Sequence, residues 1–172
     1  HGEAFGWMAA ERFELTGQGE AAERLCDQWR LSREQLDAFA VESHRRAAAA
    51  AAAGHFQKEI VHVPVMQVRE KGMEGEAPPF TADETIRPGT AVEKLATLKT
   101  SFRTDGRLTA GNSSQISDGA AVLLLMSAGK AQALGLTPRA RVRAVTTVGS
   151  DPTLMLTGPI AAPENNLAFT RT

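Results

Sequence analysis

The sequence predicts a layered α/β fold, and three observations support this. The first third of the chain carries apolar residues at helical spacing. A wholly apolar run at 121–126 suits a strand buried on both faces. From there the order strand, helix, strand continues to residue 149, which is typical of layered α/β cores. The chain has 172 residues, of which 42% are hydrophobic, so it is long enough for one domain or for pieces of two.

Two helices are expected in the first third of the chain. Residues 20–29 place four apolar side chains on one helical face: Ala22, Leu25, Cys26 and Trp29. Ser32 then begins SREQ, in which Ser32 and Gln35 have the spacing of a capping box. The alanine run 47–53 favours a helix strongly. We expect this second helix to end at Gly54, because glycine is the usual residue just past a helix end.

The middle of the chain is expected to hold a short strand, a long loop and a short helix. IVHVPV (60–65) predicts a strand, and Pro64 within it indicates an edge position or a strand end. Residues 69–89 are charged and rich in Gly and Pro, which predicts an exposed loop. Thr90 and Glu93, in TAVE, have capping-box spacing and predict the start of a helix.

The last third of the chain supplies the strand, helix, strand pattern. AVLLLM (121–126) predicts a strand buried on both faces. Ser127 is expected to cap a following helix that Gly135 closes. RVRAVTTVG (141–149) predicts a further strand. The composition changes near residue 117, which separates this layered part from the helices and long loops before it.

Composition excludes several classes of function. A net charge of −1 gives no support for nucleic-acid binding or for a membrane-surface role. The sequence has no apolar run long enough to span a bilayer and no recognisable signal peptide. Its four histidines and one cysteine lack metal-ligand spacing. One cysteine also excludes an internal disulfide and fits a reducing compartment, so we expect a cytoplasmic protein.

The single cysteine invites a nucleophile hypothesis, which the pattern does not favour. Cys26 lies on the apolar stripe of its helix, and this predicts a buried, inert thiol. His44 and His55 are the available partners, but the sequence gives no geometry for either. His44, in SHRR, is expected on a solvated helix face.

A polar loop, TAGNSS (109–114), precedes the apolar run. Ala110 and Gly111 project little side chain, so another molecule could lie against the backbone there. Asn112 and Asp118 have short side chains that bond nearby backbone, and we expect them to shape the loop. Two interpretations follow from these residues alone: a loop that a ligand approaches, or a structural turn that feeds a core strand.

Residues 83–126 extend this loop into a longer pattern, DETIRPGTAVEKLATLKTSFRTDGRLTAGNSSQISDGAAVLLLM. This stretch closely resembles the thiolase family, the acyl-CoA C-acyltransferases, in which an EKLAxLKPaF helix precedes a TAGNaSxxxDGAAA signature. Residues 19–50, 54–65 and 149–162 resemble further motifs of the family, in the same order. The resemblance covers roughly residues 17–162.

The resemblance implies acyl transfer on 3-ketoacyl-CoA by a ping-pong route. In the family a cysteine thiolate takes the acyl group, a second cysteine moves a proton, and His and Asn side chains stabilise developing negative charge. The nucleophile of the family lies upstream of the matched part, and its GHP and C-x-GGG motifs lie downstream. None of these motifs occurs in residues 1–172. No catalytic residue is therefore assigned, and CoA thioesters are expected as substrates, with no cofactor.

The resemblance also implies a domain division and an assembly. Residues 1–116 match the loop domain, in which the family holds CoA. Residues 117–136 match the return strand and helix of the N-terminal core, and residues 137–172 match the start of the C-terminal core. Thiolases are dimers or dimers of dimers, so a homo-oligomer is implied.

Five residues are carried over as candidates for binding CoA and substrate. Arg87 matches an arginine that approaches the nucleotide end of CoA, and Phe102 an aromatic near the adenine and pantetheine. Ala110 and Ser114 match residues that line the pantetheine arm, and Met155 matches a methionine close to the reacting acyl group. Taken alone, Arg87 would be a solvated surface charge, and Phe102 and Met155 would be core residues.

Departures from the family pattern bear on the type of enzyme. Gly17 and Gln18 stand where short-chain biosynthetic thiolases carry His and Met, which favours degradative thiolases of fatty-acid or sterol breakdown. Lys94 replaces a serine and Thr100 a proline, and residues 164–172 do not match the expected helix. Two alternatives stay open: a truncated, non-catalytic chain that binds CoA or needs a partner subunit, and an inactive remnant that does not fold.

Overall fold

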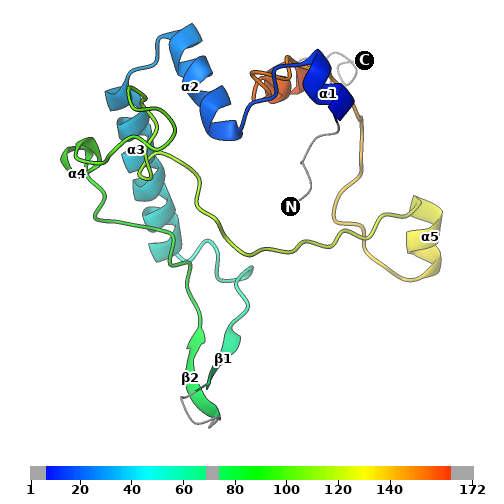
Figure 1. Cartoon of the computed structure of the whole chain (residues 1–172). Helices are drawn as coiled ribbons and strands as arrows, with labels where there is room; N and C mark the ends of the chain where they lie inside the picture. The colour runs from blue at the N-terminus through cyan, green and yellow to red at the C-terminus, as the bar shows by residue number, and fades with distance from the viewer. Residues whose placement is uncertain (1–6, 69–73, 164–172) are drawn as a thin grey trace. The chain divides into compact units, whose positions relative to one another are not determined.

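The computed structural model describes residues 7–68 and 74–163 (Figure 1). Within these ranges the regular secondary structure is mainly helical, with one two-stranded hairpin, and long segments have no regular secondary structure. The elements in chain order are α1 (Trp7–Arg12), α2 (Gln18–Trp29), α3 (Arg33–Ala52), β1 (Val63–Val68), β2 (Glu74–Phe80), α4 (Val92–Ala96) and α5 (Ala128–Ala133). The residues expected to depart from the family helix, 164–172, lie outside the described part.

The chain divides into two compact units. The central unit, Leu31–Gln115, contains α3, the hairpin and α4. The flanking unit combines the described residues up to Arg30 with those from Ile116 onward, and it contains α1, α2 and α5. The division predicted from the resemblance, at residues 116 and 136, stays a prediction.

The first predicted helix is confirmed as α2, in the flanking unit. Of the predicted apolar stripe, Leu25 and Cys26 are buried and Ala22 is half-buried, while Ala21, which was not part of the stripe, is also buried. Trp29, expected on the same face, is 47% exposed. It is the last residue of the helix, and the next residue, Arg30, takes a left-handed backbone conformation with φ 53° that ends the helical path.

The second predicted helix is confirmed as α3, with the capping box at its start. The Ser32 hydroxyl accepts a hydrogen bond from the Gln35 backbone N–H at 3.2 Å. The Gln35 side-chain Oε1 accepts one from the Ser32 N–H at 2.8 Å. At the other end Gly54 has φ 75°, a conformation that favours glycine. These local signals set both ends of α3.

The capping box predicted at Thr90 is wrong. The residue that precedes α4 in extended conformation is Ala91, and no side chain caps the helix there. The Thr90 hydroxyl instead donates a hydrogen bond to the Arg87 carbonyl at 2.8 Å. The hydroxyl therefore closes a turn before the helix, which is the competing use of short hydroxyl side chains.

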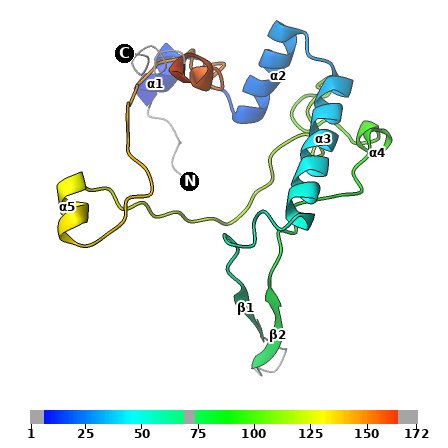
Figure 2. The same ribbon diagram turned by 180° about the vertical axis from the view of Figure 1, so that it is seen from behind.

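The strand predicted at 60–65 is present with shifted bounds, as β1, and its partner β2 lies in the segment predicted to be a loop. The two strands pair antiparallel, with Val63 opposite Phe80 and Val68 opposite Glu74. The register is irregular between Val63 and Val65, where Pro64 has no N–H to donate. Figures 1 and 2 show the hairpin beyond the C-terminal end of α3.

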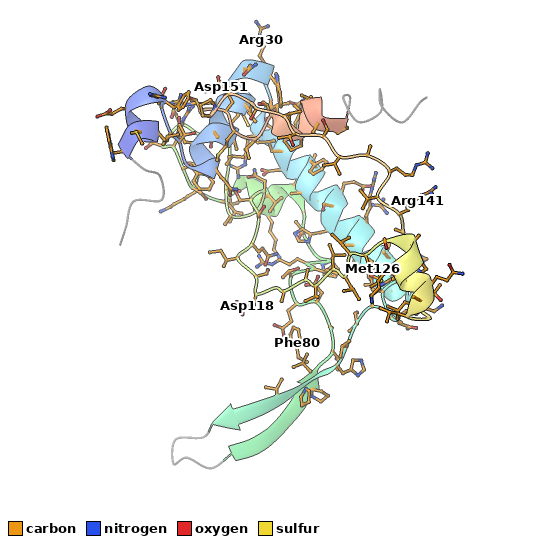
Figure 3. The ribbon with its side chains drawn as sticks, turned by 90° about the vertical axis from the view of Figure 1, so that its right-hand side faces the viewer. Arg30, Phe80, Asp118, Met126, Arg141 and Asp151 are labelled. Atoms are coloured by element: carbon orange, nitrogen blue, oxygen red, sulfur yellow. The ribbon has the colours of Figure 1, made fainter. Side chains whose placement is uncertain are left out.

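The strand predicted at 121–126 is absent. These residues have no regular secondary structure, and Val122 and Leu123 are 95% and 86% exposed. Figure 3 labels Asp118, which precedes this segment, and Met126, its last residue. A strand buried on both faces needs neighbouring strands and covering helices, and the described residues provide neither for it. The strand predicted at 141–149 is likewise absent.

The helix between these two segments is present. The Ser127 hydroxyl accepts a hydrogen bond from the Lys130 backbone N–H at 3.2 Å, so Ser127 caps α5 as predicted. Gly135 follows the helix with φ 66°. Residues 158–163 are also helical. Helices form here because their hydrogen bonds are local, whereas a strand depends on partners distant in sequence.

The cap of α3 gives a stability prediction. Replacing Ser32 with Ala removes the acceptor for the Gln35 N–H and should lower the free energy of unfolding by about 1 kcal/mol. Urea unfolding followed by circular dichroism measures this change. Ser43→Ala is the matched control, because Ser43 is exposed within the same helix and makes no cap. Equal effects of the two substitutions would contradict a capping role.

Candidate functional site

The TAGNSS loop is fixed by the side chain of Asn112. Its Oδ1 accepts a hydrogen bond from the Thr109 N–H at 2.8 Å. Its Nδ2 donates to the Arg107 carbonyl at 3.1 Å and to Asp37 Oδ1, on α3, at 2.8 Å. The prediction that Asn112 shapes the loop is thus confirmed, whereas the same role for Asp118 stays a prediction.

The Asp37 carboxylate joins this loop to two helices. Asp37 is only 1% exposed, and a charged group is tolerated there because its oxygens are hydrogen-bonded. Arg33 Nε donates to Asp37 Oδ2 at 2.7 Å. A second nitrogen of Arg33 donates to the carbonyls of Leu95, in α4, and of Leu98, just after it, at 2.5 and 3.3 Å. This Asp37 network (Arg33, Asp37 and Asn112) therefore holds α3, α4 and the TAGNSS loop together.

Gly111 faces the interior of the central unit. A Cβ added at Gly111 would lie 2.5 Å from Leu95 Cδ2 and 2.7 Å from Leu98 Cδ1, so these leucine side chains would have to move to admit it. The Gly111 N–H also donates to Thr109 Oγ1 at 3.1 Å, and Thr109 is fully buried. Packing against Leu95 and Leu98 explains why this position is glycine, while the expectation that another molecule lies against its backbone stays a prediction.

The residues on either side of this inward turn face solvent. Ala110 and Ser114 are both exposed, while Gly111, Asn112 and Ser113 between them are half-buried. The loop thus has features of both a structural turn and a loop that a ligand could approach. Its centre is a structural turn, and its ends present a small side chain and a hydroxyl outward.

Phe102 lies in the segment that pairs with the start of this loop. Thr100 and Thr109 form an isolated antiparallel bridge, and the Ser101 N–H donates to the Leu108 carbonyl at 2.8 Å. Phe102 is 51% exposed, so the interpretation of it as a core residue is wrong. It lines a shallow hollow of about 630 Å³ formed by residues 98–104. An exposed ring in such a hollow suits a flat or apolar ligand group.

Arg87 is the fourth candidate residue of the central unit, and its side chain is exposed. Its backbone N–H donates to His44 Nδ1, on α3, at 3.2 Å. His44 is half-buried, so the expectation of a solvated side chain is wrong. The sequence contained one usable signal: His44 follows Asp37 by seven residues, which places both on one face of α3.

Met155 belongs to the flanking unit and is half-buried. Its backbone has φ 27°, which is unusual for a residue other than glycine. Its N–H donates to the Asp151 carbonyl at 2.8 Å. The central unit therefore contains Arg87, Phe102, Ala110 and Ser114, and Met155 lies in the other unit.

Cys26 is 3% exposed within α2, which confirms the prediction of a buried thiol. Residues 7–68 and 74–163 contain no group of three or more His, Cys, Asp or Glu side chains able to hold a metal ion. No helix in these ranges is long and apolar enough to cross a membrane.

Comparison with known proteins identifies the family. Residues 6–129 match the family described as "Thiolase, N-terminal domain". An acetyl-CoA acetyltransferase of Pseudomonas aeruginosa is 46% identical over 149 residues, which cover 87% of this chain and 37% of that protein. A 3-ketoacyl-CoA thiolase of Yersinia pestis is 46% identical over 154 residues, covering 89% and 38%.

Solved structures agree with this match. The acetyl-CoA acetyltransferase of Bacillus anthracis matches with a TM-score of 0.76 and 41% identity over 87% of this chain and 36% of that one. That of Syntrophomonas wolfei matches with a TM-score of 0.69 and 31% identity. The chain therefore belongs to the thiolase family, and its predicted thiolase-like α/β fold is confirmed. It spans little more than a third of the length of these relatives.

The close approach at Gly111 gives a second prediction. Gly111→Ala forces a methyl group against Leu95 and Leu98 and should lower the free energy of unfolding by about 1–3 kcal/mol. Gly89→Ala is the control, because a Cβ there would meet no atom within 4 Å. Denaturant titration of both variants measures the difference. A Gly111 variant as stable as the Gly89 variant would contradict the packing role.

The Asn112 amide gives a third prediction. Asn112→Ala leaves Asp37 Oδ1 and the Thr109 N–H without their partner, and should lower the free energy of unfolding by roughly 2–4 kcal/mol. Gln115→Ala is the control, because Gln115 is an exposed amide with one hydrogen bond, to the Thr85 carbonyl. Its loss should cost less than about 1 kcal/mol. Thermal and urea unfolding should rank the two variants in this order.

Proposed function

We propose that this chain is the CoA-holding part of a degradative-type thiolase, an acyl-CoA C-acyltransferase acting on 3-ketoacyl-CoA. The observation that carries the proposal is the TAGNSS loop. The Asp37 network fixes its centre and leaves Ala110 and Ser114 exposed, beside a segment that presents Phe102. A rigid loop that presents a hydroxyl and open backbone loses little conformational entropy when it binds an extended ligand arm.

In the proposed protein this chain binds and orients the substrate. Ser114 and Ala110 would contact the pantetheine arm, Phe102 the region near the adenine, and Arg87 the nucleotide end. The thiolate of a cysteine would add to the C3 carbonyl, and cleavage of the C2–C3 bond would leave the acyl group on that cysteine. C2 would take a proton from the second cysteine of the family, so that acetyl-CoA leaves, and the thiol of a further CoA would then accept the acyl group. Both cysteines would come from family motifs not found in residues 1–172, because Cys26 is buried in α2.

Two observations support the degradative type. Gly17 and Gln18 replace the His-Met pair of short-chain biosynthetic thiolases. Several of the relatives, including the Yersinia pestis protein, are 3-ketoacyl-CoA thiolases by name, and the Pseudomonas aeruginosa relative is named acetyl-CoA acetyltransferase. Met155 would shape the acyl pocket without taking part in the chemistry.

Assembly is part of the proposal. Four consecutive apolar residues, Val122 to Leu125, are each at least 76% exposed, and such a run is normally covered by protein. We therefore propose that further protein covers this segment in the working enzyme, and that the enzyme is a homo-oligomer. A cytoplasmic location accords with a sequence that contains a single cysteine.

The runner-up function is a non-catalytic chain that binds CoA or requires a partner subunit to supply cysteines. It shares with the thiolase proposal the observation that Cys26, the one cysteine in residues 1–172, is buried. The intact mass of the protein isolated from its source separates the two. A mass well above 18.3 kDa, together with an acyl-cysteine adduct after incubation with 3-ketoacyl-CoA, supports the thiolase. A mass of 18.3 kDa with CoA binding and no adduct supports the runner-up.

Two adjacent serines provide a fourth prediction. Ser114→Ala should weaken CoA binding roughly fivefold, the effect of losing one hydrogen bond of about 1 kcal/mol. Ser113→Ala is the control, because the Ser113 hydroxyl is buried without a hydrogen-bond partner among the described residues. Cys26→Ala should leave the affinity unchanged. Titration calorimetry measures the affinity, and the rise in melting temperature with CoA checks it.

The order of these affinities is the test. Equal weakening by the two serine variants would show that the loop is perturbed as a whole and would contradict a ligand contact at Ser114. Loss of CoA binding in a folded Cys26→Ala variant would contradict the structural role of that thiol. A chain whose melting temperature does not respond to CoA would overturn the proposed function itself.

A further inference from the structure

The backbone of Arg87 is held on both sides. Its N–H donates to His44 Nδ1 at 3.2 Å. Its carbonyl accepts from the Thr90 N–H at 3.1 Å and from the Thr90 hydroxyl at 2.8 Å. A loop residue whose backbone N–H and carbonyl are both hydrogen-bonded has little freedom to change φ and ψ. The direction of its Cα–Cβ bond, and so the position from which its side chain extends, is therefore restricted.

The residues before Arg87 are fixed as well. Asp83 Oδ1 accepts hydrogen bonds from the Thr85 hydroxyl at 2.6 Å and the Thr85 N–H at 2.8 Å, and these bonds lower the pKa of Asp83. The Thr85 carbonyl accepts from Gln115 Nε2 at 3.2 Å. Thr85 therefore joins the Arg87 strap (residues 83–90) to Gln115, just after the TAGNSS loop, and Arg87 joins the strap to α3.

The guanidinium of Arg87 differs from those of α3 in the same unit. Arg33 pairs with Asp37 at 2.7 Å, and Arg45 and Arg46 each pair with Glu42 at 2.6 Å. The hydrogen bonds from Arg45 and then Arg46 lower the pKa of Glu42 to about 2. Arg87 is exposed and makes no ion pair with any described residue. A fixed backbone below a free guanidinium is the arrangement expected of an anion-binding arginine.

We propose that His44 is a positioning residue, which orients Arg87 toward the phosphate groups at the nucleotide end of CoA. The inference rests on the proposed function, because Arg87 can contact these phosphate groups only if the chain binds CoA. His44 acts through its Nδ1 lone pair, which accepts the Arg87 N–H, and so the ring proton of neutral His44 lies on Nε2. His44 itself does not contact the ligand.

Two near-isosteric variants separate positioning from packing. His44→Leu fills much of the imidazole space and has no acceptor. His44→Asn places Oδ1 where Nδ1 lies, so it should restore the bond to the Arg87 N–H. CoA affinity is measured by titration calorimetry on wild type and both variants. We expect about a threefold to tenfold loss for His44→Leu, the effect of one hydrogen bond, and near wild-type affinity for His44→Asn.

The same substitution in an Arg87→Ala background tests whether His44 acts through Arg87. Arg87→Ala alone should weaken binding, and adding His44→Leu should then cause no further loss. Circular dichroism and melting temperature confirm that each variant is folded.

Three results would overturn the proposal. The first is an unchanged CoA affinity of His44→Leu, and the second is a failure of His44→Asn to restore binding. The third is that His44→Leu weakens binding as much in the Arg87→Ala background as it does in the wild type. In each of these the wild type still binds CoA, so the proposed function stands. A wild type that binds no CoA overturns both.

Discussion

The central unit depends on one buried interaction, the hydrogen bond between Asn112 and Asp37. A carboxylate that is 1% exposed is costly unless its oxygens are paired, and here one oxygen meets Asn112 while the other meets Arg33. Each partner also bonds backbone elsewhere. Asn112 bonds the backbone of Thr109 and Arg107, which precede it, and Arg33 bonds the carbonyls of Leu95, in α4, and Leu98, just after it. The side chains that pair with the Asp37 carboxylate thus also position α3, α4 and the TAGNSS loop, three segments that are separated in sequence.

Local signals in the sequence predicted the helices well. The ends of α3 followed from Ser32, Gln35 and Gly54, because caps involve residues within one turn of each other. The same reasoning failed at Thr90, where a hydroxyl three residues from a Glu closes a turn on Arg87 instead of capping α4. A capping box and a turn use the same donors and acceptors, and only tertiary contacts decide between them.

Non-local structure was predicted less well, for a physical reason. The apolar run 121–126 has the composition of a buried strand, but strands are stabilised by partners, and the described part of this chain gives it none. The Asp37 network was missed because no spacing rule links Asp37 with Asn112, 75 residues away. The candidate site residues came from family motifs, whereas the reason that Gly111 is glycine emerged only from its contact with Leu95.

One face of α3 connects the two halves of the candidate site. Arg33, Asp37 and His44 follow one another at intervals of four and seven residues, so they lie along one side of the helix. Asp37 holds the TAGNSS loop, with Ser114 at its exposed end, and His44 holds the strap that carries Arg87. Two links then set the distance between the two proposed CoA contacts: the helix α3, at about 1.5 Å of rise per residue, and the direct bond from Gln115 Nε2 to the Thr85 carbonyl. A flexible, extended ligand such as CoA loses conformational entropy on binding. When the two contacts are already held in place, the protein loops lose little further entropy, so the total entropic cost of binding is smaller.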